Sequence, residues 1–267
     1  MCAAAGQGQT GACAVNVANK QPIEDLITLA VNNNNIAHNN AQTGTQINLR
    51  DMYLDEAYTE PGNQSTSLND LRINGDGKLD SAHIRRDAVG ADMVALILNS
   101  GSGVAYVNAS ASSAFSTTRY SYISGHTFAH ELGHNWGCYH DRANSGVQTD
   151  YAHGYPDPNG AFRSILSYPC PGVCTRVNWY SNDVAQYNGQ PIGNASNNCA
   201  RKINERRNTV ANFRQAVGSP VTTPAPVTST SAPVTTPVGT PSPVSQSAVQ
   251  EALDFVNEAI VELEKLV

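Results

Sequence analysis

The residues best suited to chemistry are three histidines and a glutamate in the stretch HELGHNWGCYHD, residues 130–141. Neutral imidazoles are zinc ligands, and His130, His134 and His140 would supply three of them while leaving a fourth coordination position open. Zinc with an open position activates water and polarises carbonyl groups, and Glu131 would be the base that takes the proton from that water. The stretch therefore predicts one catalytic zinc ion and the hydrolysis of peptide bonds.

The spacing within this stretch requires a helix followed by a sharp turn. His130 and His134 are four residues apart, so they would share one helix face, whereas Glu131 is offset and would lean over the metal as a base. Gly137 can adopt dihedral angles closed to other residues, so we expect the helix to end there and the chain to bring His140 back to the same metal. The alternative is a helix with three surface histidines, but five fixed positions in eleven make an accidental match rare.

The extended pattern resembles that of the metzincin clan of zinc endopeptidases, and Asp141 after the third histidine resembles the adamalysin, or reprolysin-like, branch. Metzincins carry a tight turn beneath the metal, often Ser-Ile-Met-Ser-Tyr, and residues 164–168 read SILSY. Leucine and methionine have similar volumes, so the resemblance implies that Leu166 forms the floor of the metal site. Some metzincin families use a tyrosine at the position of Tyr168 as an extra ligand, but adamalysin-like enzymes generally do not. The resemblance leaves Tyr168 as either a transition-state donor or a structural tyrosine packed under the site.

A second segment carries the same resemblance upstream of the motif. The run GADMVALIL at 90–98 leads into GVAYV at 103–107. This resembles the reprolysin-like segment in which a buried strand precedes the edge strand that pairs with extended substrate, and the resemblance covers roughly residues 23–215. It implies that substrate binds along Gly103, Val104, Ala105 and Tyr106. The loop at 178–187 could wall the pocket for the residue after the cleaved bond, with Trp179 and Tyr180 as either lining or core side chains.

Hydrophobic periodicity and the resemblance together predict the fold class. Apolar residues at helical or strand spacing predict helices after Pro22, over 84–89, over 125–136 and over 203–217, and strands over 47–58 and 94–98. We expect an α/β (α+β), metzincin-like catalytic domain with a twisted, mostly parallel sheet, an antiparallel edge strand and helices, plus a smaller irregular C-terminal subdomain. The usual first strand of this fold is not evident before the first helix.

The segment NGDGKLD, residues 74–80, resembles a calcium-binding loop. It has Arg72 where the first ligand should be an acid and His83 where the last should be a glutamate. We therefore expect a tight turn, and the alternative of a structural calcium ion has no support at either end of the loop.

Six cysteines, at positions 2, 13, 138, 170, 174 and 199, allow 15 pairings. Disulfides in an extracellular domain are the preferred interpretation. A bridge from Cys138 to the Cys170/Cys174 loop would clamp the turn to the third histidine, and Cys2 could pair with Cys13. An N-terminal thiol that caps the zinc is a further alternative. Three Asn-x-Ser sequons, at Asn63, Asn108 and Asn194, would suit a secreted glycoprotein.

Charge and hydropathy exclude two classes of partner. The net charge is −6, of which the last twenty residues contribute −4, so the rest is near neutral, and without a basic patch we expect no nucleic-acid partner. No stretch of about 18 apolar residues is present, so we expect no membrane span. The N-terminus lacks the charged region and apolar core of a signal peptide. A fragment or processed form of a secreted protein, without its leader, is the preferred reading, and a cytoplasmic protein is the alternative.

Composition divides the chain into four parts. They are an irregular segment at 1–20, the catalytic domain at 21–217, a Pro/Thr/Ser-rich linker at 218–247 and an amphipathic heptad helix at 248–267. The apolar residues of the last part, between positions 249 and 267, recur at spacings of 4, 3, 4, 3 and 4. This favours self-association or docking through 249–267, against a lone amphipathic helix that is marginal in water.

Together these features predict a secreted zinc endopeptidase that acts on extended protein or peptide substrates. The alternative is a weakly active or inactive binding module with the metzincin fold, which associates through its C-terminal helix. Leu166 and the missing first strand and leader motivate that alternative.

Overall fold

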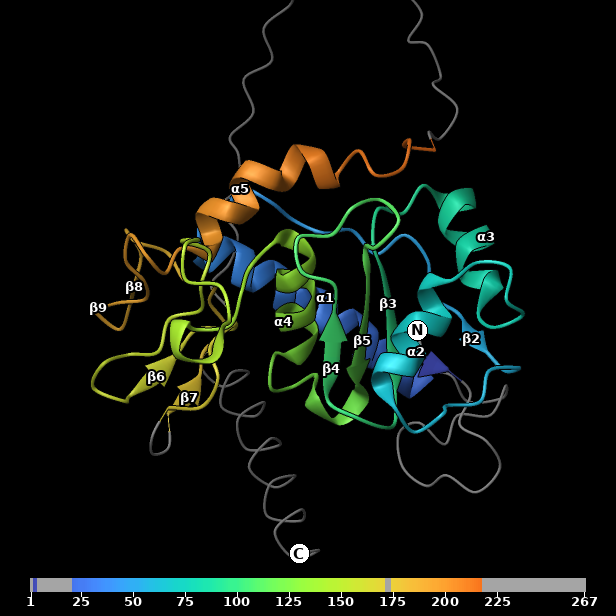
Figure 1. Ribbon diagram of the computed structural model, residues 1–267, viewed down its shortest axis with the longest axis horizontal. Helices are drawn as coiled ribbons and strands as arrows, with labels where there is room; N and C mark the ends of the chain where they lie inside the picture. Colours follow the sequence, from blue (N-terminus) through green and yellow to red (C-terminus); the bar gives the residue numbers. More distant parts are fainter. Residues whose placement is uncertain (1, 4–20, 171–173, 218–267) are drawn as a thin grey trace, which may run out of the picture. The chain divides into compact units, whose positions relative to one another are not determined.

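The computed structural model describes residues 2–3, 21–170 and 174–217, all of which belong to the first of two units into which the chain divides (Figure 1). The unit combines helices with small sheets, as the sequence predicts for an α/β chain. The predicted linker at 218–247 and heptad helix at 248–267 lie outside the described residues, as does most of the segment at 1–20. Among the described residues, none of the helices combines the length and the hydropathy that a membrane-spanning helix needs.

The main sheet has five strands. Their order is β2 (Leu54–Asp55), β1 (Cys2–Ala3), β3 (Val94–Leu98), β5 (Phe115–Arg119) and β4 (Gly103–Ala105). All neighbouring pairs are parallel except β4 and β5, so the one antiparallel strand of this sheet lies at its edge. The expectation that no strand precedes the first helix is wrong, because Cys2–Ala3 pairs between β2 and β3.

The strand predicted over 47–58 is also mostly wrong. The structure has a strand only at Leu54–Asp55. The residues before it pair with side chains instead of another strand: the Asn35 side chain bonds both the N–H and the C=O of Ile47, at 2.8 and 2.9 Å. A bidentate Arg85–Asp51 pair holds the next part, with both distances 2.7 Å. Alternating apolar residues therefore marked an extended segment rather than a sheet strand.

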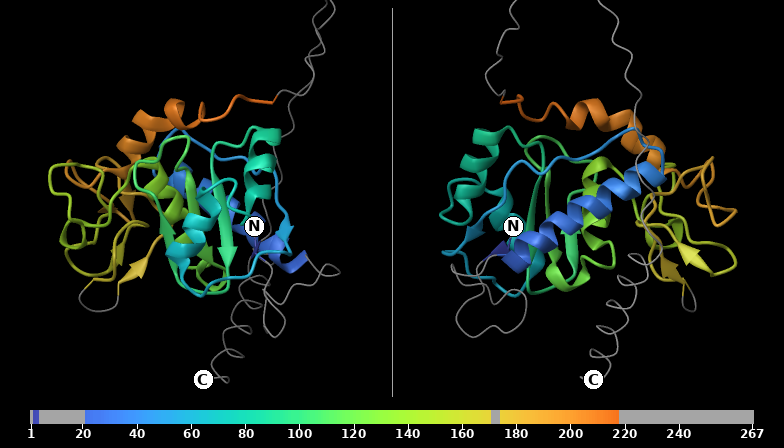
Figure 2. Two further views of the ribbon diagram at one scale, coloured as in Figure 1. Left: turned by 45° about the vertical axis from the view of Figure 1, so that its right-hand side comes forward. Right: turned by 180° about the vertical axis from the view of Figure 1, so that it is seen from behind.

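Helices cover both faces of the sheet. They are α1 (Gln21–Asn40), α2 (Gln64–Arg72), α3 (Asp80–Val89), α4 (Thr127–Trp136) and α5 (Cys199–Val210), with short 3-10 turns η1 (Tyr120–Tyr122) and η2 (Arg142–Asn144). From behind, α1 crosses the sheet diagonally (Figure 2). Ile97 packs with α1 and α4, whereas Leu96 and Leu98 pack with α2 and α3. The apolar run 94–98 is therefore buried on both faces, as a central strand should be.

Two helices begin earlier than the sequence predicts, and the C-terminal one also ends earlier, at Val210 instead of 217. The C-terminal helix begins at Cys199, before the predicted 203, since Asn198 Oδ1 accepts the N–H of Arg201 at 2.9 Å. The helix predicted at 84–89 begins at Asp80. Its carboxylate accepts hydrogen bonds from Gly75 and Gly77 N–H at 2.6 and 3.0 Å, which closes the 74–80 segment as a turn.

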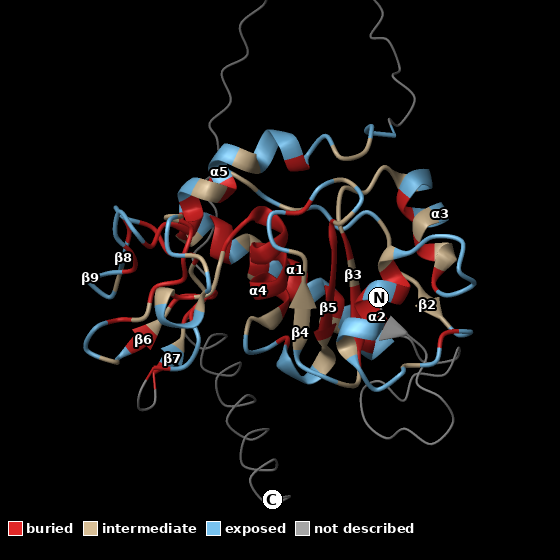
Figure 3. Ribbon diagram, in the orientation of Figure 1, coloured by how far each residue is buried: buried red, intermediate tan, exposed pale blue. Residues whose placement is uncertain are grey.

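After Gly137 the chain changes character. We call residues 21–137 the sheet region and residues 138–198 the loop region. The loop region contains two small sheets, β6 (Phe162–Arg163) parallel to β7 (Thr175–Arg176), and β8 (Gln186–Tyr187) antiparallel to β9 (Gln190–Pro191). Burial is continuous through α4, β3 and β5 and patchy in the loop region (Figure 3).

Candidate active site

Helix α4 carries the first two histidines, and its ends depend on unusual backbone conformations. His126 before the helix and Gly137 after it both have left-handed dihedrals, with φ of 63° and 102°. The N–H of Gly137 reaches His134 O at 2.8 Å and that of Cys138 reaches Gly133 O at 2.9 Å, which closes the helix. A φ of 102° strains any L side chain, so glycine lets the chain turn back as the sequence predicts.

The turn brings the three histidines together. Their Nε2 atoms lie 3.1 Å apart for His130 and His134, 3.2 Å for His130 and His140, and 3.0 Å for His134 and His140. A metal about 2.0–2.1 Å from each of three tetrahedral nitrogens would hold those nitrogens roughly 3.3 Å apart. The spacing of the three atoms therefore fits a single metal ion.

The hydrogen bonds on the other ring nitrogens set the tautomers. His130 Nδ1 lies 2.8 Å from Ile165 O, and His134 Nδ1 lies 2.8 Å from Cys138 O. A carbonyl oxygen only accepts, so both Nδ1 atoms carry protons and both Nε2 atoms present lone pairs. Two lone pairs that face each other at about 3 Å repel, and a cation between them removes this conflict.

Burial keeps these imidazoles neutral. Desolvation lowers the pKa of His130 well below its usual value, that of His134 to about 4, and that of His140 as well. The histidines also disfavour one another's positive charge. The site is therefore supplied with neutral nitrogen donors across the physiological pH range.

Glu131 lies on the same helix and is 4 % exposed. Burial raises the pKa of its carboxyl group to about 8, and the positive charge of Arg176 opposes that shift. Its Oε1 lies against the backbone of Gly103, where a Cβ atom would collide with it. Helix α4 and the edge strand β4 thus hold the carboxylate between them.

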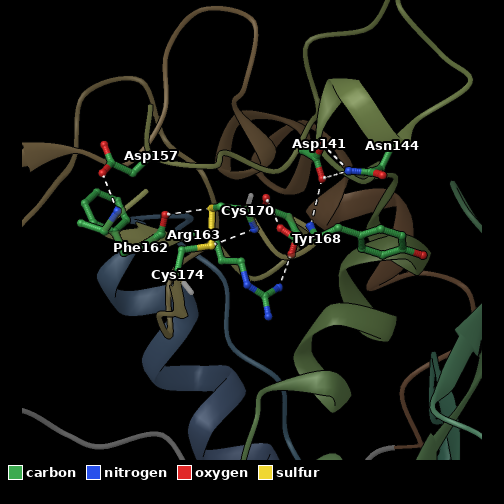
Figure 4. Close-up of a disulfide and its surroundings, with 10 residues drawn as sticks. Asp141, Asn144, Asp157, Phe162, Arg163, Tyr168, Cys170 and Cys174 are labelled. Carbon is green, nitrogen blue, oxygen red and sulfur yellow. Dashed lines mark hydrogen bonds between the residues drawn. A yellow bond between two sulfur atoms is a disulfide. The ribbon is translucent and has the colours of Figure 1, made fainter. Parts of the chain in front are cut away.

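Asp141 anchors the loop that carries the third histidine. It is 3 % exposed and accepts hydrogen bonds from Asn144 Nδ2, at 2.9 and 3.1 Å, and from Tyr168 N–H, at 2.9 Å (Figure 4). The Tyr168 ring lies beside that of His140, with 4.1 Å between centroids, and is 40 % exposed. Tyr168 is therefore open to solvent beside the histidines and not packed beneath them.

Leu166 lies under the helix of the first two histidines. It is fully buried, and a Cβ atom on Gly133 would come within 2.7 Å of its Cδ2. The preceding residue supplies the carbonyl that orients His130. The SILSY turn thus packs as a floor with leucine in the place of methionine.

The edge strand presents part of its backbone away from the sheet. Arg119 N–H donates to Ser102 O at 2.7 Å, so by the alternation of an antiparallel pair the peptide groups of Gly103 and Ala105 point away from β5 and those of Val104 point toward it. The Gly103 carbonyl accepts a hydrogen bond from Gln64 Nε2 at 3.0 Å.

Tyr106, the last of the four predicted substrate-binding residues, turns toward α2. Its hydroxyl accepts from Arg72 Nε at 2.9 Å and lies 3.0 Å from Asn69 Oδ1. Of the four residues, Ala105 has the backbone groups best placed for a substrate, because they point away from β5 and have no hydrogen bond to other described residues.

The cysteine prediction needs correction. Cys170 is bonded to Cys174, so neither is bridged to Cys138 (Figure 4). Cys138 is a buried thiol whose sulfur lies 3.7 Å from Cys199 O. Its side chain therefore lies against the start of α5, where Cys199 is the first residue.

The two aromatic residues that the sequence offered as pocket lining or core, Trp179 and Tyr180, have different surroundings. Tyr180 is fully buried, with its hydroxyl 2.8 Å from both Asn34 Oδ1 and Ala129 O. It is a core residue that ties α1 to α4. Trp179 packs, half-buried, against the small cluster of the loop region that includes Phe162 and Ile192.

Sequence reasoning missed Arg176. Its Nη1 donates to Gly125 O at 3.1 Å and to Thr127 Oγ1 at 3.4 Å, immediately before the metal helix. It is the one charged residue between positions 164 and 182. A lone cation so soon after the SILSY turn was the signal that could have revealed it.

Part of the chain matches a known protein family. Residues 24–141 match the family model described as metallo-peptidase family M12B, reprolysin-like. The chain belongs to the reprolysin-like metallopeptidases. This confirms the branch predicted from Asp141, and the family and the three-histidine group together support a metal cofactor.

Two curated relatives of this metallopeptidase are bacterial. A "Peptidyl-Asp metalloendopeptidase" of Xanthomonas campestris pv. campestris is 36% identical over 200 residues, which are 72% of this chain and 47% of the relative. A protein of the same name from Stenotrophomonas maltophilia is 35% identical over 202 residues, 72% of this chain and 48% of the relative. The chain thus spans about half the length of the curated relatives it matches.

A solved structure supports the fold alone. A chain in "Structure of a chaperone-substrate complex" superposes with a TM-score of 0.54 at 20% identity, over 73% of this chain and 33% of that one.

Proposed function

We propose that this reprolysin-like metallopeptidase is a zinc-dependent endopeptidase, with His130, His134 and His140 as the zinc ligands and Glu131 as the general base. The observation that carries the proposal is the convergence of three Nε2 atoms, at 3.0–3.2 Å, two of which are fixed as lone-pair donors by carbonyl oxygens. When bound there, zinc would acidify a water molecule and polarise the scissile carbonyl.

Other groups of the chain would orient the zinc ligands and transfer the proton. Ile165 O and Cys138 O orient His130 and His134 through their Nδ1 protons. Glu131 accepts a proton from the attacking water and delivers it to the leaving amine. Its pKa of about 8 suits a group that must both take and return a proton, and a bound cation would favour the charged form.

The edge strand would hold the substrate in an extended conformation. Peptide groups of Gly103 and Ala105 that point away from β5 can pair with a substrate main chain, as in other cases of strand addition. The Gln64 side chain donates to the Gly103 carbonyl, so a substrate main chain that pairs with Gly103 would meet Gln64 there.

For the substrate, we propose cleavage beside an acidic residue, aspartate first. The names of the two relatives motivate this, and a cation near the base, Arg176, is consistent with it. For the location, we propose an extracellular enzyme, because the Cys170–Cys174 disulfide suits an oxidising compartment.

The test is zinc content combined with cleavage. The purified chain should bind one zinc ion and cleave casein, and a chelator should stop cleavage until zinc is restored. Glu131→Gln should retain the zinc and lose cleavage by on the order of 10²–10⁴-fold. Near-normal turnover by this variant would contradict the assignment of the base. Zinc binding without any cleavage by the unmodified chain would favour the binding module instead.

A further inference from the structure

Arg176 is built into the wall of the active site rather than its surface. It lies on β7, in register with Arg163 on β6. Its Nη1 holds Gly125 O at 3.1 Å and Thr127 Oγ1 at 3.4 Å, so the guanidinium group sits at the start of the metal helix. The side chain is half-buried, and it is close enough to Glu131 for each charge to shift the pKa of the other.

Much of its hydrogen-bonding capacity is unused. A guanidinium group has five N–H donors, and the two bonds above come from a single nitrogen. Its Nε is buried without a hydrogen-bond partner among the described residues, and Arg176 forms no ion pair within them. Unpaired buried donors of a charged group are costly, which makes this side chain ready to bind an anion.

Arg163, on the neighbouring strand, also has a buried Nε without a hydrogen-bond partner among the described residues, but its charged neighbours differ. Arg163 donates to Ser167 O and is stabilised by the charge of Asp141. Arg176 is repelled by Arg163, and the groups that favour its charge are the Glu131 carboxylate and, to a smaller extent, the Tyr168 phenol. Glu131 is committed to the reaction in the proposed function, and among the described residues Arg176 forms no ion pair with another carboxylate. Within that part of the chain, the positive charge of Arg176 is thus left for a ligand.

The position of the base indicates which substrate residue would meet this charge. Glu131 returns its proton to the leaving amine, which belongs to the residue that follows the cleaved bond. That residue must therefore lie on the Glu131 side of the metal site, where Arg176 is. We infer that Arg176 is the specificity-determining residue of this enzyme, and that it binds the side-chain carboxylate of an acidic residue that follows the cleaved bond. This inference rests on the proposed function.

The expected preference for aspartate follows from the strength of a hydrogen bond between Arg176 and the substrate carboxylate. A charged hydrogen bond made in a partly desolvated site should favour aspartate over asparagine at this position by about 10–100-fold. Arg176→Gln keeps a donor for Gly125 O and Thr127 Oγ1 but removes the charge. Its ratio of kcat/KM for aspartate and asparagine peptides should fall to about 3 or less. Arg176→Lys keeps the charge as a point donor and should retain a preference between the two.

The experiment uses matched peptides with Asp, Asn or Ala at one position, with products mapped by mass spectrometry. A second measurement determines the Kd of the same peptides for zinc-loaded Glu131→Gln protein, with and without Arg176→Gln. Because this binding measurement needs no turnover, it separates failure of Arg176 from failure of the catalytic proposal. Zinc content and the thermal unfolding midpoint report that each variant is folded.

The matched control is Arg163→Gln, which removes the same charge from the neighbouring strand. It should keep the preference for aspartate, because Arg163 already donates to Ser167 O and its charge is favoured by Asp141. An unchanged Asp/Asn ratio in Arg176→Gln, in both cleavage and binding, would overturn the inference. So would an equal loss of the ratio in Arg163→Gln, since that would show only a general field of positive charge.

Discussion

The sheet region and the loop region hold their shapes by different means. In the sheet region, β3 presents apolar side chains to both faces, and these pack against helices on either side. The loop region has one small apolar cluster of its own, around Phe162, Val177 and Ile192. Much of its remaining order comes from side chains that bind backbone groups. Examples are Ser181 Oγ, which donates to His153 O at 2.6 Å, and Asn182 Nδ2, which donates to Ala41 O at 2.7 Å.

The proposed metal site takes residues from both regions. Two of its histidines come from a helix of the sheet region, and the third comes from the loop region. Apolar packing of Leu166 against Gly133 fixes the height of the floor, whereas the Asp141 hydrogen bonds fix the third histidine. One half of the proposed site should therefore fail through lost packing, and the other half through lost polar contacts.

The largest effect is expected from Leu96→Ala in the sheet region. Leu96 is fully buried on the central strand, and its truncation should cost about 2–5 kcal/mol of the free energy of unfolding. The matched change in the loop region, Ile192→Ala, also removes a fully buried side chain but from a smaller cluster near the surface, which can collapse. We expect less than half the cost, measured by urea denaturation at pH 8. Equal costs would show that the loop region is held by apolar packing after all.

The sequence predicted the sheet region better than the loop region. The run 94–98 has one dominant interaction, burial on both faces, so its pattern sufficed to predict a central strand. The stretch 130–141 could be placed on a helix and turn because histidine spacing and Gly137 leave few geometries. The 47–58 segment failed because Asn35 and Arg85, distant in sequence, satisfy it with side chains.

The loop region could be predicted less well for a physical reason. Contacts such as that between Tyr180 and Asn34 join positions more than a hundred residues apart and leave no local period. Cys174, four residues from Cys170, is its disulfide partner, and no pattern in the sequence distinguishes this pairing from the others that six cysteines allow. Arg176 gains its place in the site from the register of β7 with β6, which only the folded chain reveals.

The second prediction tests the polar half of the metal site. Asp141→Ala removes the acceptor for Asn144 Nδ2 and Tyr168 N–H, so the loop that carries His140 should loosen. We expect zinc affinity to fall by about 10–100-fold, as is typical when groups that support metal ligands are lost. Competition with a chelator of known affinity measures this.

The control for this prediction is Asp157→Ala in the same region. Asp157 is also buried, but it accepts Ala161 N–H at the turn before β6, away from the histidines. Zinc affinity should stay within about threefold of the unmodified chain. A similar loss in both variants would mean that the whole loop region must be intact to hold zinc, and Asp141 would have no special role.

The smallest effect concerns His38, which joins the two regions. It lies on α1 with its ring 6.1 Å from that of Trp136 and 5.1 Å from that of Tyr180, and Nδ1 lies 2.9 Å from Thr43 Oγ1. Burial lowers its pKa from 6.5 to about 4. The unfolded chain therefore binds more protons than the folded chain between these pH values, and stability falls as pH drops below 6.5.

His38→Gln should lose part of this pH dependence. Near pH 8 the variant should be less stable than the unmodified chain, because the ring contacts are gone. At pH 5.5 the difference in the free energy of unfolding between the two proteins should narrow by about 1 kcal/mol. The unmodified chain loses up to about 1.4 kcal/mol of stability for each pH unit below the unfolded pKa of His38, and the variant does not. His130 and His134 titrate over the same range in both proteins, so the difference between the proteins, measured by urea denaturation at each pH, isolates His38. A gap that stays constant from pH 8 to pH 5.5 would mean that the ring can take up its proton without leaving the core, and the contact between the two regions would then be more pliable than its burial indicates.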